Sequence, residues 1–435
     1  MNSDDTIVAP ATPLGRSALA IVRIDGPSSG TIVSLLAGSL PSPRIATHTA
    51  ITHKGQLLDD CVVTRFVAPH SFTGNDLVEI TLHGNPLLVE RVIASCVALG
   101  ARMAEPGEFS ERAVLNGKLD LVQAESIADL INARTALQAK LSLSNLEGTL
   151  SRHAAAIRES LLHVISRLEA ALDFSEEGYE FISRGDARAA LVDALNETRT
   201  LADTYRRGQA SREGLSAVIL GRPNAGKSTL LNRLVGSDRA IVTPIPGTTR
   251  DIVRETIEIG GLPVTLADTA GLRDASDMVE GIGVSRAREA AERADVILYL
   301  VDSAAGITAE DEVERYPDAL VVWTKTDLKP APHGALGISV AAERGIDALL
   351  SRLDVLVRET FAAPEGSLVN ERQRQAVAGC ADALESSLET LDEGADEQLI
   401  LVDLYRASTS LGLLTGAITR DEVFSEIFAK FCIGK

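Results

Sequence analysis

Short apolar runs broken by turn residues characterise the first quarter of the chain. Residues 18–24, 60–67 and 77–82 form such runs, and Gly and Pro separate them, as in Asp25-Gly26-Pro27. Apolar and β-branched runs of this length, bounded by turn residues, are typical of β-strands. We therefore predict an α+β domain over residues 1–117.

From about residue 118 the apolar positions fall three and four residues apart. The residues that carry this spacing are Ile127, Leu130, Ile131, Leu137, Leu141, Leu161, Ile165, Leu168 and Leu172. Such positions share one face of a helix, so a helical bundle is predicted over residues 118–210. After Pro364 the chain returns to helix, with residues 376–391 and 397–414 as examples, and residues 358–435 are predicted to complete the bundle.

Between these helical stretches, apolar strands alternate with helical segments. The predicted strands are residues 215–220, 264–267, 296–301, 320–323 and 336–340. This alternation predicts a mostly parallel sheet with helices on both faces. The chain is therefore predicted to be a multidomain α/β protein, in which an α/β domain over residues 211–357 interrupts a discontinuous helical domain. Such an insertion is tolerated because the ends of a compact domain usually lie close together.

Composition narrows the setting. The 435 residues are enough for several domains, and 45% of them are hydrophobic, which indicates a folded protein. No apolar run approaches the roughly 18 residues of a membrane span. The acidic N-terminus lacks a secretory pattern, and the four cysteines form no Cys-x-x-Cys pair. We expect a cytoplasmic protein with no membrane span. The net charge of −19 is a weak footprint for nucleic acid, which we expect to meet a local basic patch or to bind through a partner.

The segment from Gly221 to Ser228 fits Gly-x-x-x-x-Gly-Lys-Ser, the pattern of a phosphate-binding loop. It follows a predicted strand and precedes an apolar helical run, which is the context that the motif requires. The glycines let backbone N–H groups turn toward phosphate, and the helix N-terminus adds a favourable dipole. Lys227 is expected to reach the β- and γ-phosphates, and the Ser228 hydroxyl to hold Mg²⁺.

Two later segments extend this site. Thr249, in the sequence Pro-Gly-Thr-Thr-Arg-Asp, is predicted to complete Mg²⁺ coordination from a mobile loop. Asp268 directly follows a predicted strand and is expected near the metal, while the Gly271 N–H is placed to bond the γ-phosphate.

Base choice is predicted from Thr324-Lys325-Thr326-Asp327, which follows another strand. The Asp327 carboxylate can accept two hydrogen bonds from guanine, a pair that adenine does not offer, and Lys325 can lie over the ring. Residues 339–341 are expected to support the base through backbone contacts. Thr324 stands where GTPases usually carry Asn, and its hydroxyl replaces only part of an amide's bonding. The residues predicted to bind GTP or GDP are Asn224, Ala225, Gly226, Lys227, Ser228, Thr229, Thr243, Pro244, Ile245, Pro246, Gly247, Thr248, Thr249, Asp268, Thr269, Ala270, Gly271, Thr324, Lys325, Thr326 and Asp327.

Hydrolysis needs a group other than the Gln that many GTPases use to orient water, because Leu272 occupies that position. Asn224 is one candidate, as a ligand of a monovalent cation whose shell would be completed by carbonyls of residues 243–248. The alternative for Asn224 is a local hydrogen bond within its loop. Glu280 is a second candidate, placed to position water, and its alternative is a solvated surface acid.

The last residues form a distinct feature. Phe424, Phe428 and Phe431 predict an apolar helix face that docks the tail, which ends Cys432-Ile433-Gly434-Lys435. Flanking lysines would make Cys432 reactive, whereas burial would make it inert, and both readings stay open. Residues 71–76 and 118–120 are taken alone as turn and helix-cap chemistry.

Taken together, these segments resemble the MnmE (TrmE) family of tRNA-modification GTPases over the whole chain. The motifs that carry the resemblance are Asp5-Thr6-Ile7-Val8-Ala9, Ala11-Thr12-Pro13 with Gly15-Arg16, Phe72-Thr73-Gly74, Pro106-Gly107-Glu108-Phe109-Ser110, the phosphate-binding loop, Asp268-Thr269-Ala270-Gly271-Leu272-Arg273 and the terminal Cys432-Ile433-Gly434-Lys435. The resemblance implies an N-terminal, aminomethyltransferase-like α+β domain that dimerises and binds 5-formyltetrahydrofolate or a related folate, and a Ras-like G domain.

The resemblance also assigns residues. Arg23, Glu79, Lys118 and Lys435 match folate positions, Cys432 matches a cysteine required for tRNA modification, and Glu280 matches the catalytic acid. A potassium-activated GTPase with G-domain dimerisation is implied, with K⁺ held by Asn224, Thr243, Ile245 and Thr248. The implied partner is the FAD protein MnmG in a heterotetramer, and the implied product is an aminomethyl or carboxymethylaminomethyl group on C5 of the wobble uridine. Asn75 departs from the family's usual Glu.

Two other functions compete with this one. A ribosome-assembly or signalling GTPase would act as a binding switch, and it predicts an RNA-binding appendage such as a KH module, of which the sequence shows no basic Gly-x-x-Gly loop. A folate-binding aminomethyl-transfer enzyme with a regulatory G domain would turn over folate without MnmG.

Overall fold

The computed structural model describes residues 5–174, 181–237, 239–241, 254–267, 288–308, 311–417, 427–428, 431–432 and 434. They belong to two compact units. Unit 1 is drawn from Met1–Ala128, Leu146–Arg158 and Ser408–Lys435, and unit 2 from Asp129–Asn145 and Glu159–Ala407. The domain boundaries predicted from sequence stay a prediction.

Unit 1 is built on a six-stranded sheet in the order β3-β4-β5-β2-β1-β6. Its strands are β1 (Ile7–Pro10), β2 (Leu19–Asp25), β3 (Thr47–His53), β4 (Gln56–Phe66), β5 (Leu77–His83) and β6 (Arg102–Met103). All neighbours are antiparallel except β1 and β6, which run parallel. Three of these strands, β2, β4 and β5, confirm the predicted runs. The other three were missed, since they are short or alternate with polar residues.

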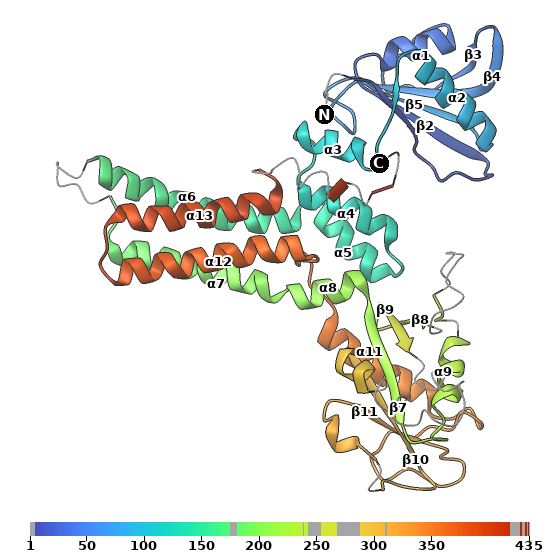
Figure 1. The fold of residues 1–435 in the computed structure, drawn as a ribbon, viewed down its shortest axis with the longest axis vertical. Helices are drawn as coiled ribbons and strands as arrows, with labels where there is room; N and C mark the ends of the chain where they lie inside the picture. Colours follow the sequence, from blue (N-terminus) through green and yellow to red (C-terminus); the bar gives the residue numbers. More distant parts are fainter. Residues whose placement is uncertain are drawn as a thin grey trace. The chain divides into compact units, whose positions relative to one another are not determined.

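The two faces of this sheet are covered differently (Figure 1). The helices α1 (Ser29–Ala37) and α2 (Pro86–Ala98) pack on one face, where buried side chains of β2, β4 and β5 form the larger core. On the other face, Ile7, Ala9 and Ala104 pack with Phe109 of α3 (Glu108–Leu115) and with Phe72. This second face carries the candidate site of unit 1.

Unit 1 also holds the first residues of α4 (Leu121–Asn132) and the described tail. Asp120 and Gln123 cap α4 reciprocally, because each side chain accepts a hydrogen bond from the other residue's backbone N–H. The predicted cap chemistry at residues 118–120 is thereby confirmed. Phe428 is buried against Leu121, and its ring centroid lies 5.2 Å from that of Phe431. The predicted docking of the aromatic tail is thus confirmed for these two residues, whereas Phe424 lies outside the described residues.

Unit 2 contains a five-stranded sheet and most of the long helices. The remaining helices are α5 (Ala136–Leu146), α6 (Thr149–Asp173), α7 (Arg184–Asp203), α8 (Tyr205–Glu213), α9 (Lys227–Val235), α11 (Ile346–Phe361), α12 (Glu371–Asp392) and α13 (Glu397–Thr415), with a 3₁₀ turn, η3, at Val313–Arg315. The first residues of α6 and the last of α13 belong to unit 1. α7 and α12 lie antiparallel, joined by the exposed ion pairs Arg188–Asp392 and Arg199–Glu385. None of the helices in the described part of the chain is long and apolar enough to cross a bilayer.

The sheet of unit 2 has the order β11-β10-β7-β9-β8. Its strands are β7 (Leu215–Gly221), β8 (Arg254–Ile259), β9 (Leu262–Ala267), β10 (Val296–Asp302) and β11 (Leu320–Thr324). All pairs are parallel except β8 with β9, which confirms the predicted, mostly parallel sheet. Buried side chains of α9 and α11 pack with the strands in one core cluster, and a second cluster includes Ala291 and Tyr299.

The predicted strand at residues 336–340 was wrong. This segment touches β11 through two hydrogen bonds around Trp323, from Trp323 N–H to the Leu336 carbonyl (2.8 Å) and from Ile338 N–H to the Trp323 carbonyl (2.7 Å). Ser339 then pairs with Arg344 of its own segment, which turns the chain away before a ladder can form.

Candidate functional site

The nucleotide motifs of unit 2 follow the ends of three neighbouring parallel strands. Leu300 of β10 pairs with Gly221 at the end of β7, and Asp302 at the end of β10 pairs with Thr324 at the end of β11. Ligands of open α/β sheets bind at this carboxyl edge, where the loops of adjacent strands meet. The fold therefore brings the phosphate-binding loop and the predicted base loop together.

The phosphate-binding loop depends on backbone conformations that few residues adopt. Gly221 has φ 136°, and a Cβ there would lie 2.4 Å from the Leu300 carbonyl oxygen, so only glycine fits beside β10. Asn224 has φ 67°, which Asn tolerates better than most residues. The first turn of α9 contains no acidic residue, so its N-terminal dipole stays available to an anion.

The side chains of this loop are placed as follows. The Lys227 ammonium donates to the carbonyls of Gly221 and Arg222, both at 2.8 Å. The Asn224 side chain is exposed and makes no hydrogen bond within the described residues, so the alternative of a local loop bond is not seen there. The Ser228 hydroxyl follows at the start of α9.

The base loop is tied to the phosphate-binding loop by Thr324. Its hydroxyl, almost fully buried, lies 2.8 Å from the Ala225 carbonyl and 3.3 Å from that of Val301. The Lys325 ammonium forms an ion pair with Asp302 at 2.7 Å. Partial burial raises the pKa of Asp302, but Lys325 and the Ala304 N–H outweigh it, and the pKa is lowered overall.

Asp327 is also held in place. Its Oδ1 accepts a hydrogen bond from the Ser339 hydroxyl at 2.6 Å, and its Oδ2 has no partner within the described residues. A carboxylate fixed by one oxygen suits recognition of a guanine edge. Sequence reasoning gave Ser339 only a backbone role and missed Asp302, although an acid that directly ends a predicted strand was a usable signal.

The rest of the predicted nucleotide site cannot be placed. The residues outside the described part of the chain are Thr243, Pro244, Ile245, Pro246, Gly247, Thr248, Thr249, Asp268, Thr269, Ala270, Gly271, Leu272 and Glu280. Their predicted roles stay predictions.

A second candidate site lies on the α3 face of the unit 1 sheet. Arg23 of β2 pairs in register with Glu79 of β5, and the guanidinium donates to Glu79 Oε1 through Nε (3.1 Å) and Nη2 (2.7 Å). The rings of Phe72 and Phe109 lie 5.3 and 5.6 Å from the guanidinium carbon, within range of cation–π attraction. Two of the residues predicted to bind folate therefore meet directly.

The tail reaches this site. The Gly434 carbonyl accepts a hydrogen bond from Arg23 Nη1 at 3.4 Å. Gly434 has φ 94°, and a Cβ on it would lie 2.0 Å from the Pro10 carbonyl oxygen, so glycine is required for this approach. The Cys432 carbonyl accepts from the Gly107 N–H at 3.4 Å. The tail thus passes along the start of α3 before it meets Arg23.

The other two predicted folate residues are less well defined. Lys118 is exposed, and its Cγ lies 3.2 Å from where a Cβ on Gly74 would stand. Among the described residues, its ammonium makes no ion pair with Glu79. Lys435 lies outside the described residues.

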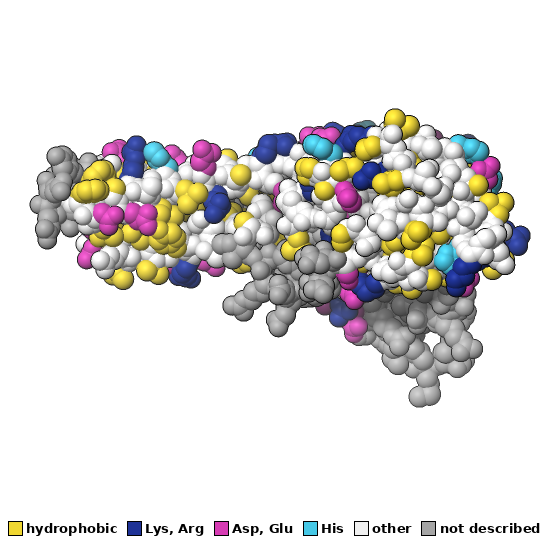
Figure 2. All heavy atoms as spheres, turned by 90° about the horizontal axis from the view of Figure 1, so that it is seen from above, with side chains coloured by type: hydrophobic (Ala, Val, Ile, Leu, Met, Phe, Trp, Pro, Cys, Tyr) yellow, Lys and Arg dark blue, Asp and Glu magenta, His cyan; other side chains and the backbone are white. Residues whose placement is uncertain are grey.

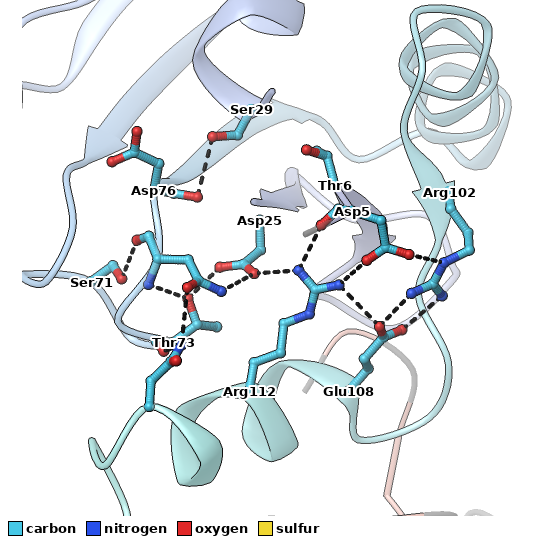
Figure 3. Close-up of polar contacts among 12 residues, drawn as sticks. Asp5, Thr6, Asp25, Ser29, Ser71, Thr73, Asp76, Arg102, Glu108 and Arg112 are labelled. Carbon is cyan, nitrogen blue, oxygen red and sulfur yellow. Dashed lines mark hydrogen bonds and ion pairs between the residues drawn. The ribbon is translucent and has the colours of Figure 1, made fainter. Parts of the chain in front are cut away.

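A buried polar network supports the same face and was not anticipated from sequence (Figure 3). Arg112 of α3 binds Asp5, Asp25 and Glu108, and Arg102 binds Asp5 and Glu108 in turn. Hydrogen bonding to Arg102 lowers the pKa of Asp5. Burial raises the pKa of Glu108, but Arg102, the Glu105 N–H and Arg112 together lower it.

Asn75 belongs to this network. Its amide nitrogen donates to Asp25 Oδ2 at 3.0 Å, and its amide oxygen accepts from Asn116 at 3.0 Å. A Glu at this position could accept but not donate while ionised, and it would face the Asp25 carboxylate. The departure from the family's usual residue therefore has a local physical account.

The four cysteines differ in exposure. Cys61, Cys96 and Cys380 are buried, and burial raises the pKa of each thiol to about 12. Cys432 is exposed, so the alternative of a buried, inert tail cysteine was wrong. The lysines that would activate its thiol, Lys430 and Lys435, lie outside the described residues.

Comparisons with known proteins agree along the whole chain. The model of the GTP-binding protein TrmE N-terminus matches residues 6–118, and the MnmE helical domain model matches residues 121–432. The tRNA modification GTPase MnmE of Koribacter versatilis (strain Ellin345) is 40% identical over 459 residues, covering 100% of both chains. The protein of the same name from Pseudomonas syringae pv. tomato is 39% identical over 451 residues, covering 99% of each.

Among solved structures, the G domain of the T. maritima FeoB iron transporter aligns over 33% of this chain and 97% of that one, at 21% identity and a TM-score of 0.23. A likeness that low supports no conclusion, whereas the full-length sequence matches do. The chain belongs to the MnmE family of tRNA modification GTPases.

Proposed function

We propose that this chain is the GTP-hydrolysing component of the system that modifies C5 of the wobble uridine (U34) of certain tRNAs. It acts with the FAD-containing protein MnmG and a folate one-carbon donor, 5-formyltetrahydrofolate or a related folate. The group added is aminomethyl or carboxymethylaminomethyl, with its methylene from the folate.

The observation that carries this proposal is the contact between Arg23 and the tail. Arg23, already paired with Glu79, donates to the Gly434 carbonyl, and the two residues lie 411 positions apart in the chain. If the site binds folate and Cys432 of the tail takes part in the modification, the two must lie close together, and this contact supports that arrangement. Arg23 and Glu79 would hold the folate, with Lys118 and Lys435 as further ligands, and the folate would supply the one-carbon unit.

The G domain supplies the GTPase half of the proposal. Lys227 and Asp327 would hold the phosphates and the guanine, and Ser228 and Thr249 would hold Mg²⁺, which neutralises phosphate charge. Asn224 would hold K⁺ with Thr243, Ile245 and Thr248, and the ion would stabilise charge where other GTPases use an arginine finger. Glu280 would position the attacking water. Hydrolysis would then time the modification through closure and opening of paired G domains.

The net charge of the chain favours tRNA binding through a partner protein. The chain carries a net charge of −19, and on the face drawn in Figure 2 Lys and Arg are scattered among Asp and Glu. We infer that most tRNA contact belongs to MnmG, in a heterotetramer with a homodimer of this chain formed through its N-terminal domain. Tight, salt-sensitive tRNA binding by this chain alone in a gel-shift experiment would argue against that.

The decisive experiment is the wobble-nucleoside profile of tRNA from a deletion strain complemented with the wild-type gene or with Cys432→Ser. Wild type should restore the modified uridine, and Cys432→Ser should not, while the purified variant hydrolyses GTP normally. Modified uridine in the Cys432→Ser strain would contradict the role of the tail. Modification in a strain that lacks MnmG would favour a self-sufficient folate-dependent transferase instead.

The cation proposal has its own test. GTP hydrolysis should be much faster in K⁺ than in Na⁺, and Asn224→Gly should remove that difference. Gly tolerates the φ of 67° at this position, so the variant deletes the side-chain oxygen without straining the loop. Equal wild-type rates in the two salts would exclude Asn224 as a K⁺ ligand.

A further inference from the structure

Asp25 lies two residues after Arg23 on β2, so both side chains project from the same face of the sheet. The Asp25 side chain is completely buried, in a protein region where a lone carboxylate would be unfavourable. No role follows for it from the family resemblance or from the nucleotide site. Its partners indicate what it does.

The two oxygens of Asp25 together bind two structural elements, the segment between β4 and β5 and the helix α3 (Figure 3). Oδ1 accepts from the Thr73 hydroxyl of the segment between β4 and β5. Oδ2 accepts from Arg112 Nη1 of α3 and from the Asn75 amide, both at 3.0 Å. One buried carboxylate thus fastens both a loop and a helix to β2.

The same loop and the same helix carry the aromatic rings that flank Arg23. Phe72 directly precedes Thr73, and Phe109 lies three residues before Arg112, which places both on one side of α3. These are the rings that lie 5.3 and 5.6 Å from the Arg23 guanidinium carbon. The bonds that Asp25 makes therefore help to set the separation of the two rings.

Two further contacts lock the loop to α3. Asn116, at the end of the helix, donates to the Thr73 carbonyl at 2.7 Å and to the Asn75 amide oxygen at 3.0 Å. The Asn75 N–H donates to the Thr73 hydroxyl at 3.2 Å. The Asp25–Thr73 bond is the one that joins β2 to the residue next to Phe72, so its loss would loosen the loop there while Asn75 and Asn116 still hold it.

We propose that Asp25 is a positioning residue for the Arg23–Glu79 site: by fastening the Thr73 loop and α3 to β2, it fixes Phe72 and Phe109 around Arg23 and thereby orients the guanidinium for a reduced folate. The ligand class rests on the proposed function above. Arg23 and Glu79 touch the ligand, and Asp25 acts through them.

The test compares three near-isosteric variants of the full-length chain and adds a fourth, Thr73→Ser, as a rescue variant. Asp25→Asn removes the charge, and Thr73→Val removes only the hydroxyl that reaches Asp25. Asp59→Asn is the matched control: Asp59 is a buried carboxylate on β4 of the same sheet, bonded to the backbone and ring of His83 and not to the Arg23 site. Affinity for 5-formyltetrahydrofolate is measured by calorimetry, and GTP hydrolysis is measured on the same preparations.

Asp25→Asn and Thr73→Val should each weaken binding by about tenfold or more, a change of the size that loss of one well-placed interaction produces. Asp59→Asn should change it by less than about twofold, and GTP hydrolysis should not change in any variant. Thr73→Ser, which keeps the hydroxyl, should restore the affinity. Wild-type affinity in Thr73→Val, or an equal loss in Asp59→Asn, would overturn the proposal.

Hydrogen–deuterium exchange separates this inference from the folate assignment. Peptides covering residues 67–77 and 107–117 should exchange faster in Asp25→Asn and Thr73→Val than in wild type or Asp59→Asn, with no ligand present. Unchanged exchange in these peptides would overturn the positioning role whatever the ligand. If wild type fails to bind 5-formyltetrahydrofolate while the exchange differs as stated, the folate assignment fails and the positioning role stands.

Discussion

The two candidate sites are held together by different kinds of bond. In unit 2 the phosphate-binding loop is held by side chains that bind backbone: Lys227 donates to the carbonyls of Gly221 and Arg222, and Thr324 reaches the Ala225 carbonyl. The neighbouring base loop adds one ion pair, between Lys325 and Asp302. In unit 1 charged side chains bind one another, as Arg23 does with Glu79 and Arg112 with three carboxylates.

This difference decides what a substitution does. A side chain that binds carbonyls can be removed without leaving a buried charge behind, so function is lost while the fold remains. A side chain inside an ion network leaves its partners buried and unpaired when it is removed, so stability is lost as well. The G-domain site should therefore separate activity from stability, and the Arg23 face should not.

Arg112→Met is expected to have the largest effect and is the sharpest test of the difference between the two sites. The change keeps much of the side-chain length but leaves Asp25 and Glu108 buried without their shared cation, and we expect a loss of about 3–5 kcal/mol of unfolding free energy. Hydrogen–deuterium exchange resolved by peptide should localise this loss to unit 1. Arg188→Met, which breaks the exposed pair with Asp392, is the control and should change the free energy of unfolding little. Equal effects would mean that the network contributes no more than a surface pair.

Lys227→Ala should lower activity strongly and stability little, which is the opposite of the effect expected for Arg112→Met. Loss of the charge that we propose binds the phosphates should lower GTP hydrolysis by roughly 10²-fold or more. The melting transition should move little, since loss of Lys227 leaves neutral carbonyls such as those of Gly221 and Arg222 behind. The chain has a single tryptophan, Trp323 of β11, so fluorescence reports unit 2 selectively. A large drop in that transition would show that the loop lysine holds the domain together.

The same difference between the two sites explains which of their residues could be predicted from the sequence. The phosphate-binding loop and the Thr324–Asp327 segment are contiguous motifs, and the alternation of strands and helices placed them at one sheet edge. The network around Arg112 joins Asp5, Asp25 and Glu108, which are far apart in the sequence, and no local pattern marks such partners. Arg23 and Glu79 were found only through resemblance, because a cross-strand pair depends on register.

The segment at residues 336–340 shows a second limit. Its apolar composition predicts a strand, but Ser339 bonds Asp327 through its side chain and Arg344 through its backbone instead of extending β11. At Ser339, tertiary contacts therefore override the local preference for a β-strand. Composition could not have shown that.

Thr324→Val tests whether the two nucleotide loops are coupled through one hydroxyl. Val matches the shape of Thr but cannot donate to the Ala225 or Val301 carbonyl, and loss of one buried hydrogen bond costs about 1 kcal/mol, or up to 3 where an acceptor stays unsatisfied. Nucleotide affinity, measured with a fluorescent GDP analogue, should fall by about tenfold. Thr324→Ser should bind as wild type does. If Thr324→Val binds GDP normally, the bonds of the Thr324 hydroxyl between the two loops do not contribute to nucleotide binding.

Lowering the pH should destabilise unit 1 by protonating the carboxylates of the same network. We expect this to be the smallest of the effects, because it occurs only at low pH. The folded-state pKa values of Asp5 and Glu108 lie below their ordinary values of 3.8 and 4.5, since Arg102 and Arg112 favour the ionised forms. Their contribution to stability is therefore fully present above those ordinary values and is lost as the pH falls through the lower, folded-state pKa values. Exchange of peptides from residues 102–117 should rise as pH falls below about 4.5, after correction for the intrinsic rate. Glu108→Gln should exchange faster at neutral pH and should depend less on acid than wild type. An equal acid dependence in wild type and variant would place the sensitivity elsewhere and would remove the ion network from the account of unit 1.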